Sequence, residues 1–202
     1  GEIDRICRKY QITYFADWGS LLGAVRHGGF VPWDDDLDIC MKREDYIRFR
    51  EVADSELPEH YLIHDYAHKE DHWLFLARVV SNAHICFEEQ HLKTYYNFPW
   101  MTGVDIFIKD YLYEDREQEE KRDKEILYLI TIADGIREGE IDSLTAREHL
   151  RRIASQYQVS LPVTGNAREI GIALYRLAEQ QMMRVPAEES KTIGEIFPHV
   201  LK

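Results

Sequence analysis

The sequence lacks long apolar runs and any cysteine spacing typical of a metal site. No segment approaches the roughly 18 apolar residues that a membrane-spanning helix requires. No basic segment is followed by an apolar one, so no signal peptide is expected. The three cysteines, Cys7, Cys40 and Cys86, are far apart and fit no Cys-x-x-Cys pattern, which suits a reducing compartment. These absences predict a cytoplasmic protein without a transmembrane segment.

Positive charge is also scarce in this sequence. The 25 Lys and Arg residues stand against 37 Asp and Glu residues, which gives a net charge of -12. Such a charge repels a nucleic-acid backbone or an anionic membrane surface over long range. A nucleic-acid polymer is therefore excluded as a partner. A small phosphate compound is still compatible, because a metal ion and a few basic groups can override the overall field locally.

The spacing of apolar residues predicts an α+β protein. From about residue 114 onward the apolar residues recur at helical spacing, in three successive stripes. We therefore expect a mixed β-sheet with flanking helices over residues 1–113, and a helical region over 114–202 packed on it, as a second domain or within one continuous domain. The N-terminal elements expected are helices over 3–10, from Ser20 to before Gly28, and over 43–53, and strands over 12–16, 37–41, 61–63, 74–80, 84–87 and 103–108.

Acidic residues are concentrated in residues 34–38, Asp-Asp-Asp-Leu-Asp. Carboxylates so close together repel one another unless a cation compensates. If the chain is extended from Asp36 to Asp38, both carboxylates lie on one face, with Leu37 and Ile39 directed into the core. Two hard oxygen ligands at this spacing suit Mg²⁺, with Mn²⁺ as the alternative, while Asp34 and Asp35 are expected to be loop or outer residues. The competing interpretation is an acidic, solvated loop.

Two further features point to phosphate chemistry. Asp105 lies inside an apolar strand, where an unpaired carboxylate would cost of the order of several kcal/mol. It should therefore face a cation or lie at an exposed edge. Gly19 and Ser20 form a small-residue turn before a helix, a geometry that binds phosphate through free backbone amides. An ordinary strand-to-helix turn has the same sequence pattern.

Known motifs with similar spacing do not fit. Asp34, Asp36 and Asp38 match ligand positions 1, 3 and 5 of an EF-hand calcium loop. Ile39 and Asp45, however, stand where that loop needs Gly and Glu. The sequence also has no phosphate-binding Gly-x-x-x-x-Gly-Lys-Ser/Thr loop, no Gly-x-Ser-x-Gly elbow and no His-Glu-x-x-His site.

Residues 19–27, 29–39 and 41–46 closely resemble the signature of the LicD family, which is related to the fukutin proteins. The resemblance resumes at residues 104–107 and is weak after about residue 115. It implies a nucleotidyltransferase-like fold. It also implies metal-dependent transfer of phosphocholine or a related phospho-group from a CDP-activated donor, such as CDP-choline. The acceptor would be a cell-surface glycan, such as lipopolysaccharide or teichoic acid, or its precursor.

The resemblance also assigns roles to individual residues. Asp36, Asp38 and Asp105 would form a catalytic, metal-binding triad, and Asp105 is a candidate base toward the acceptor hydroxyl. A donor carrying choline would need an aromatic cage. The residues matched to phosphate or basic positions are Gly19, Ser20, Arg26, His27, Arg43 and Arg78, and those available for the cage are Tyr95, Tyr96, Phe98 and Trp100.

The sequence departs from the family pattern in two places. Gly28 stands where the family often has Lys, and Ala83 or His84 stands where it has Thr. These departures leave the acceptor and the donor open, but they do not affect the predicted metal site. Two other functions also stay open. One is a nucleotidyltransferase that transfers NMP to a small molecule or protein, and the other is a catalytically silent acidic binding module. Peripheral attachment to the inner face of the membrane is also left open.

Overall fold

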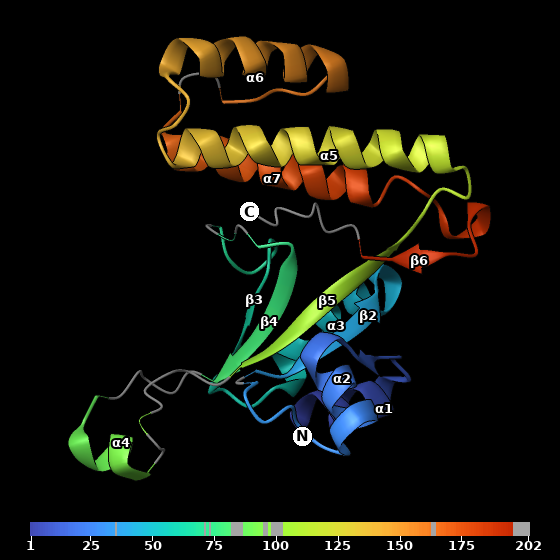
Figure 1. The fold of residues 1–202 in the computed structure, drawn as a ribbon, viewed down its shortest axis with the longest axis vertical. Coiled ribbons are helices and arrows are strands. Elements are labelled where there is room, and N and C mark those ends of the chain that lie inside the picture. The colour runs from blue at the N-terminus through green and yellow to red at the C-terminus, as the bar shows by residue number, and fades with distance from the viewer. Residues whose placement is uncertain are drawn as a thin grey trace. The chain divides into compact units, whose positions relative to one another are not determined.

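The computed structural model describes residues 1–34, 36–70, 72, 74–81, 87–94, 97, 103–162 and 165–195 (Figure 1). Helices and strands alternate first and helices follow, so the predicted α+β class is confirmed. The elements are α1 (Glu2–Tyr10), β1 (Phe15–Ala16), α2 (Trp18–His27), β2 (Asp38–Lys42), α3 (Arg43–Glu56), β3 (Tyr61–His64), β4 (Leu76–Ser81), α4 (Glu89–Thr94), β5 (Gly103–Tyr111), α5 (Arg116–Arg137), α6 (Ser143–Tyr157), α7 (Ala167–Met182), a 3₁₀ helix (Ala187–Glu189) and β6 (Ile193–Gly194).

The sheet is mixed, with the strand order β1-β2-β5-β4-β3, and β6 pairs with the end of β5. β2 and β5 are parallel, and the other neighbouring strands are antiparallel. The register places Asp38 of β2 beside Asp105 of β5, and Asp105 beside Arg78 of β4. Three residues predicted to be functional therefore lie next to one another across the middle of the sheet.

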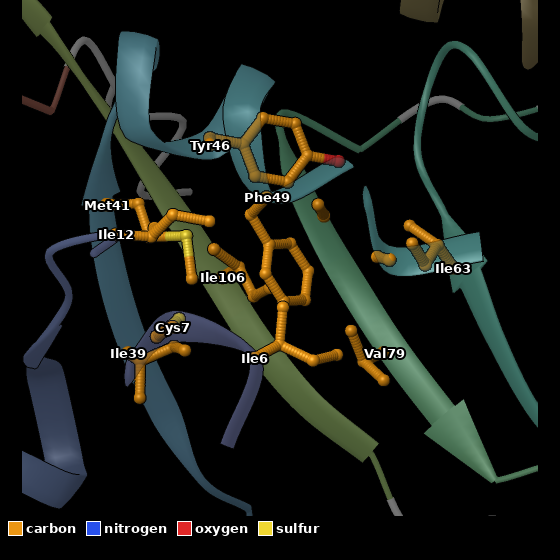
Figure 2. Packing of buried hydrophobic residues seen from close by; sticks show 12 residues of the cluster. Ile6, Cys7, Ile12, Ile39, Met41, Tyr46, Phe49, Ile63, Val79 and Ile106 are labelled. Carbon is orange, nitrogen blue, oxygen red and sulfur yellow. The ribbon is translucent and has the colours of Figure 1, made fainter. Parts of the chain in front are cut away.

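One face of the sheet, which we call the core face, is covered by α1 and α3 (Figure 2). Phe49 of α3 and Ile6 of α1 are fully buried against Met41 and Ile106 of the central strands. Burial of such a side chain stabilises a fold by about 1.5–3 kcal/mol. The buried cluster is made of Ile6, Cys7, Ile12, Tyr46, Phe49 and Ala53 with the strand residues Ile39, Met41, Ile63, Ala77, Val79 and Ile106.

The opposite face, which we call the site face, carries the alternate residues of the same strands. Side chains alternate along a strand, so Asp38 of β2 and Asp105, Phe107 and Lys109 of β5 point away from the core face. Helix α2 lies on this side, because the ring of Trp18 at its start is 5.8 Å from that of Phe107. The sheet therefore separates an apolar layer from a layer of charged residues.

The chain divides into two compact units, one of residues 1–68 and 76–109 and the other of residues 69–75 and 110–202. In the second unit α5 packs side by side with α7 (Figure 1). The stripes predicted for these two helices are buried, as expected. The domain boundary predicted after residue 113 stays a prediction, because a division into compact units does not test whether each part folds on its own. The buried stripe residues are Ile126, Leu129, Ile130, Ala133 and Ile136 in α5 and Ile170, Leu174, Leu177, Ala178 and Met182 in α7.

Three local predictions were wrong. Helix α2 begins at Trp18, after Asp17, so Ser20 lies inside the first turn and does not cap the helix. Strand β1 is limited to Phe15–Ala16, whereas a strand over 12–16 was predicted. β2 begins only at Asp38, so Leu37 is not buried and 36% of its surface is exposed. Its carbonyl instead accepts a hydrogen bond from the Asp105 amide at 2.9 Å, which joins the strand ends.

Some predictions fall outside the described residues. They include the residues of the predicted cage, Ala83 and His84, and all of the predicted strand over 84–87 except Phe87, which belongs to no strand. Among the helices that the structure describes, none has the length and apolar character to cross a membrane.

Candidate active site

Three carboxylates meet where the chain enters β2. Oxygen atoms of Asp34, Asp36 and Asp38 lie within 4.8 Å of one another. The chain reaches β2 through a turn in which the Asp34 amide donates to the Val31 carbonyl at 3.0 Å. The predicted pair Asp36 and Asp38 is thus brought together, and Asp34, expected to be a loop or outer residue, joins it. The Asp-x-Asp-x-Asp spacing was the signal that could have identified Asp34.

Gly19 makes room for this cluster. A Cβ atom on residue 19 would overlap the carboxylate of Asp34, so only glycine fits there without movement. The Asp34 Oδ2 atom is buried and has no hydrogen-bond partner in the part of the chain that the structure describes. A buried carboxylate oxygen without a partner is costly. The three carboxylates therefore fit a hard divalent cation such as Mg²⁺, which would supply the missing partner.

Asp38 is the most buried of the three carboxylates, with 5% of its surface exposed. Burial, together with the nearby charges of Asp36 and Asp105, raises its pKa to about 6, and a hydrogen bond from the Gly19 amide opposes that rise. The Asp38 amide donates to the Ser20 hydroxyl at 2.8 Å. The first turn of α2 therefore holds Asp38 in place, and a bound cation would favour its charged form.

Asp105, also 5% exposed, is paired with Arg78. Arg78 Nη2 donates to Asp105 Oδ2 at 2.5 Å, and Nε donates to Oδ1, so the pair is bidentate. Hydrogen bonding to Asp105 raises the pKa of Arg78 although burial opposes it, and the charges of Asp36 and Asp38 act in the same direction as Asp105. The buried carboxylate in β5 is thus compensated by an arginine from the neighbouring strand.

The start of α2 is anchored by residues that sequence reasoning missed. Lys109 Nζ lies 2.5 Å from Asp17 Oδ2, and Phe107 contacts Trp18. Trp18 has φ of 39°, a left-handed conformation that is costly for a bulky residue. The two β5 side chains therefore hold a strained turn directly before Gly19. Their spacing of two and four from Asp105, which places them on the same face, was the available signal.

The remaining predicted basic residues lie at the end of α2 and at the start of α3. Arg26 and His27 occupy the last turn of α2 and lie against the ring of Trp33, the residue before Asp34. Arg43 begins α3, five residues after Asp38, which corresponds to about 16 Å along β2. Its predicted role toward the donor phosphates stays a prediction.

Comparison with known sequences identifies the family. The family described as LicD/FKTN/FKRP, nucleotidyltransferase domain, matches residues 11–133, which is more than half of the chain. The chain belongs to this family. The match includes the turn at Gly19, the three clustered aspartates, Arg78 and Asp105, so the site described above lies within the shared domain.

Curated relatives of this LicD-family chain match over short segments. Lipopolysaccharide cholinephosphotransferase LicD of Haemophilus influenzae is 50% identical over 56 residues, which are 28% of this chain and 21% of that protein. Ribitol 5-phosphate transferase FKRP of Homo sapiens is 50% identical over 34 residues, which are 17% of this chain and 7% of that protein. The aligned segments thus span less than a quarter of these relatives. No solved structure matches the chain.

Proposed function

We propose that this LicD-family chain belongs to a divalent-metal-dependent transferase. It would move phosphocholine or a related phospho-group from a CDP-activated donor, such as CDP-choline, to a cell-surface glycan or its precursor. The names of the relatives support this assignment, since they describe transfer of cholinephosphate and of ribitol 5-phosphate. The observation that carries the proposal is the cluster of Asp34, Asp36 and Asp38, with a buried carboxylate oxygen that lacks a partner.

The three clustered aspartates would hold the cation, with Mg²⁺ preferred and Mn²⁺ able to replace it. When bound, the cation would supply Lewis-acid neutralisation of the charge on the donor phosphates. Gly19 makes room for the Asp34 carboxylate, and its amide donates to Asp38. The Ser20 hydroxyl accepts from the Asp38 amide and keeps its own proton, which it can donate to a phosphate oxygen.

Asp105 lies next to Asp38 on the strand β5, Arg78 lies next to Asp105 on β4, and both would also contribute to the transfer. Arg78 places a positive charge beside Asp36 and Asp38, which can steady the donor phosphates as they approach. Asp105 is the candidate base toward the acceptor hydroxyl. Both of its oxygens accept from Arg78, so one of these hydrogen bonds would have to give way to the acceptor hydroxyl.

The test is to incubate the chain with Mg²⁺ and CDP-choline, with and without a glycan acceptor, and to measure the released products. The proposal predicts CMP release and phosphocholine on the glycan. Asp36→Asn should abolish this activity. Asp123→Asn, a change of the same type at an exposed residue of α5, should leave it intact. With CTP in place of CDP-choline, release of pyrophosphate together with a nucleotide-labelled acceptor would favour nucleotidyl transfer. No product, together with no binding of divalent metal, would contradict both enzymatic assignments.

A further inference from the structure

Trp33 is a large aromatic residue that the fold holds at the surface. Its side chain is 77% exposed, although burial of an indole is strongly favourable. The guanidinium carbon of Arg26 lies 5.9 Å from the ring centroid. The His27 ring lies 6.2 Å away at an interplanar angle of 86°. The last turn of α2 thus positions the indole while leaving most of its surface open to a ligand.

The position of Trp33 links this surface to the carboxylate cluster. Trp33 directly precedes Asp34, so their Cα atoms are about 3.8 Å apart. The Asp34 amide closes a turn on the Val31 carbonyl, and the Asp34 carboxylate lies against Gly19. The aromatic surface is therefore fixed at the border of the proposed metal and phosphate site.

The surroundings of Trp33 select among the ligands that an indole can bind. A quaternary ammonium group and a nucleobase both stack on aromatic rings. The positive charge of Arg26 beside the ring disfavours a second cation such as choline, whereas it does not oppose a neutral base. In a nucleotide donor, the nucleoside is attached to the diphosphate that the carboxylate cluster would bind through a cation.

We propose that the nucleobase of the donor stacks on the exposed surface of Trp33. This inference rests on the proposed function, because it requires that the donor diphosphate bind at Asp34, Asp36 and Asp38. It adds the residue that recognises the base, and it assigns Arg26 and His27 to positioning that residue. Recognition by stacking tolerates different bases, so donors with other nucleobases should also bind.

The experiment compares CDP with inorganic pyrophosphate, which carries a diphosphate but no base. Affinities are measured by calorimetry on the whole chain with Mg²⁺ present. Trp33→Ala should weaken CDP binding by about 5-fold to 150-fold and leave pyrophosphate binding unchanged. Trp33→Phe should restore part of the loss. The matched control is Phe30→Ala, which removes a ring that is 64% exposed in the same loop and should change neither affinity.

Each other outcome would overturn the inference in a distinct way. Equal weakening of CDP and pyrophosphate by Trp33→Ala would mean that Trp33 only supports the loop. Unchanged CDP binding, or an equal loss in Phe30→Ala, would mean that the base is not recognised by Trp33 specifically. Failure of the unsubstituted chain to bind either compound would instead contradict the proposed function, and this inference with it.

Discussion

The two faces of the sheet carry opposite chemistry on the same strands. On the core face, Met41 and Ile106 are fully buried in an apolar layer with Phe49. On the site face, Asp38 and Asp105 are nearly as buried but carry like charges on neighbouring strands. The alternation of side chains lets β2 and β5 stabilise the fold on one face and concentrate charge on the other. The comparison suggests that stability and chemistry can be altered separately.

The largest expected effect is loss of turnover on the site face. Asp36→Asn and Asp38→Asn each remove a carboxylate from the cation cluster while keeping the side-chain shape. We expect at least a 100-fold fall in metal-supported transfer, since charge stabilisation by a metal contributes several kcal/mol. The measurement is CMP release from CDP-choline, and Asp123→Asn is the control. Activity within a few-fold of the unsubstituted chain would contradict the role of the cluster.

Substitutions on the core face should lower the stability of the fold, not act directly on turnover. Phe49→Ala removes a fully buried ring between α3 and the sheet, and we expect it to lower the free energy of unfolding by about 3–5 kcal/mol. Phe49→Leu, which leaves a smaller cavity, should cost less. Denaturant unfolding measures both variants. A loss below about 1 kcal/mol for Phe49→Ala would show that this layer does not carry the stability of the unit.

The site face should gain stability when the repulsion at Asp38 is removed. Because the folded-state pKa of Asp38 is raised to about 6 from 3.8, protonation stabilises the fold. That contribution is complete below pH 3.8 and is lost as the pH rises through about 6. Without divalent metal at pH 7, Asp38→Asn should therefore raise the free energy of unfolding by about 1–2 kcal/mol. The gain should vanish near pH 4.

Asp105→Asn provides the matched comparison for that measurement. Removal of the Asp105 carboxylate leaves Arg78 without its bidentate partner. We therefore expect the free energy of unfolding to fall by about 1–2 kcal/mol instead of rising. Unfolding curves in the presence of a chelator, recorded between pH 4 and pH 7, distinguish the two variants. The same sign of change for both would show that repulsion at Asp38 is not the dominant effect.

The smallest expected effect concerns the anchor of α2. Lys109→Met removes the ion pair with Asp17 before the strained Trp18, and should weaken binding of Mn²⁺ with pyrophosphate by about 5-fold. Asp17→Asn should have a similar effect, and the double variant should be no worse than either single one. Lys42→Met, at the paired position of β2, is the control. If the losses of affinity in the two single variants added up fully in the double variant, the ion pair of Lys109 and Asp17 would not be the anchor of α2.

The sequence allowed the elements with strong periodicity to be predicted. The alternation around Asp38 and Asp105 identified the two parallel strands, and the apolar stripes identified the long helices. The sequence pattern could not show where β2 begins. The pairing of the Leu37 carbonyl with the Asp105 amide depends on residues far apart in the chain. For the same reason Leu37 was wrongly assigned to the core.

Within the site, local spacing identified Asp36 and Asp38 and offered a signal for Asp34, whereas the contacts between distant elements that hold the cluster were not predictable. Asp34 enters the cluster through a turn and through its contact with Gly19. Asp17 forms an ion pair with Lys109, and its carbonyl accepts from the Leu21 amide, so the helix starts at Trp18 and not at Ser20. Such contacts depend on how α2 lies on the sheet, which periodicity does not determine.

The central claim is that Asp34, Asp36 and Asp38 bind a divalent cation. The direct measurement is a titration with Mn²⁺, followed by the electron paramagnetic resonance signal of the free ion. We predict saturable binding that weakens at least about 10-fold in both Asp34→Asn and Asp36→Asn and is unchanged in Asp123→Asn. Equal binding by all four proteins, or no binding by the unsubstituted chain, would contradict the claim.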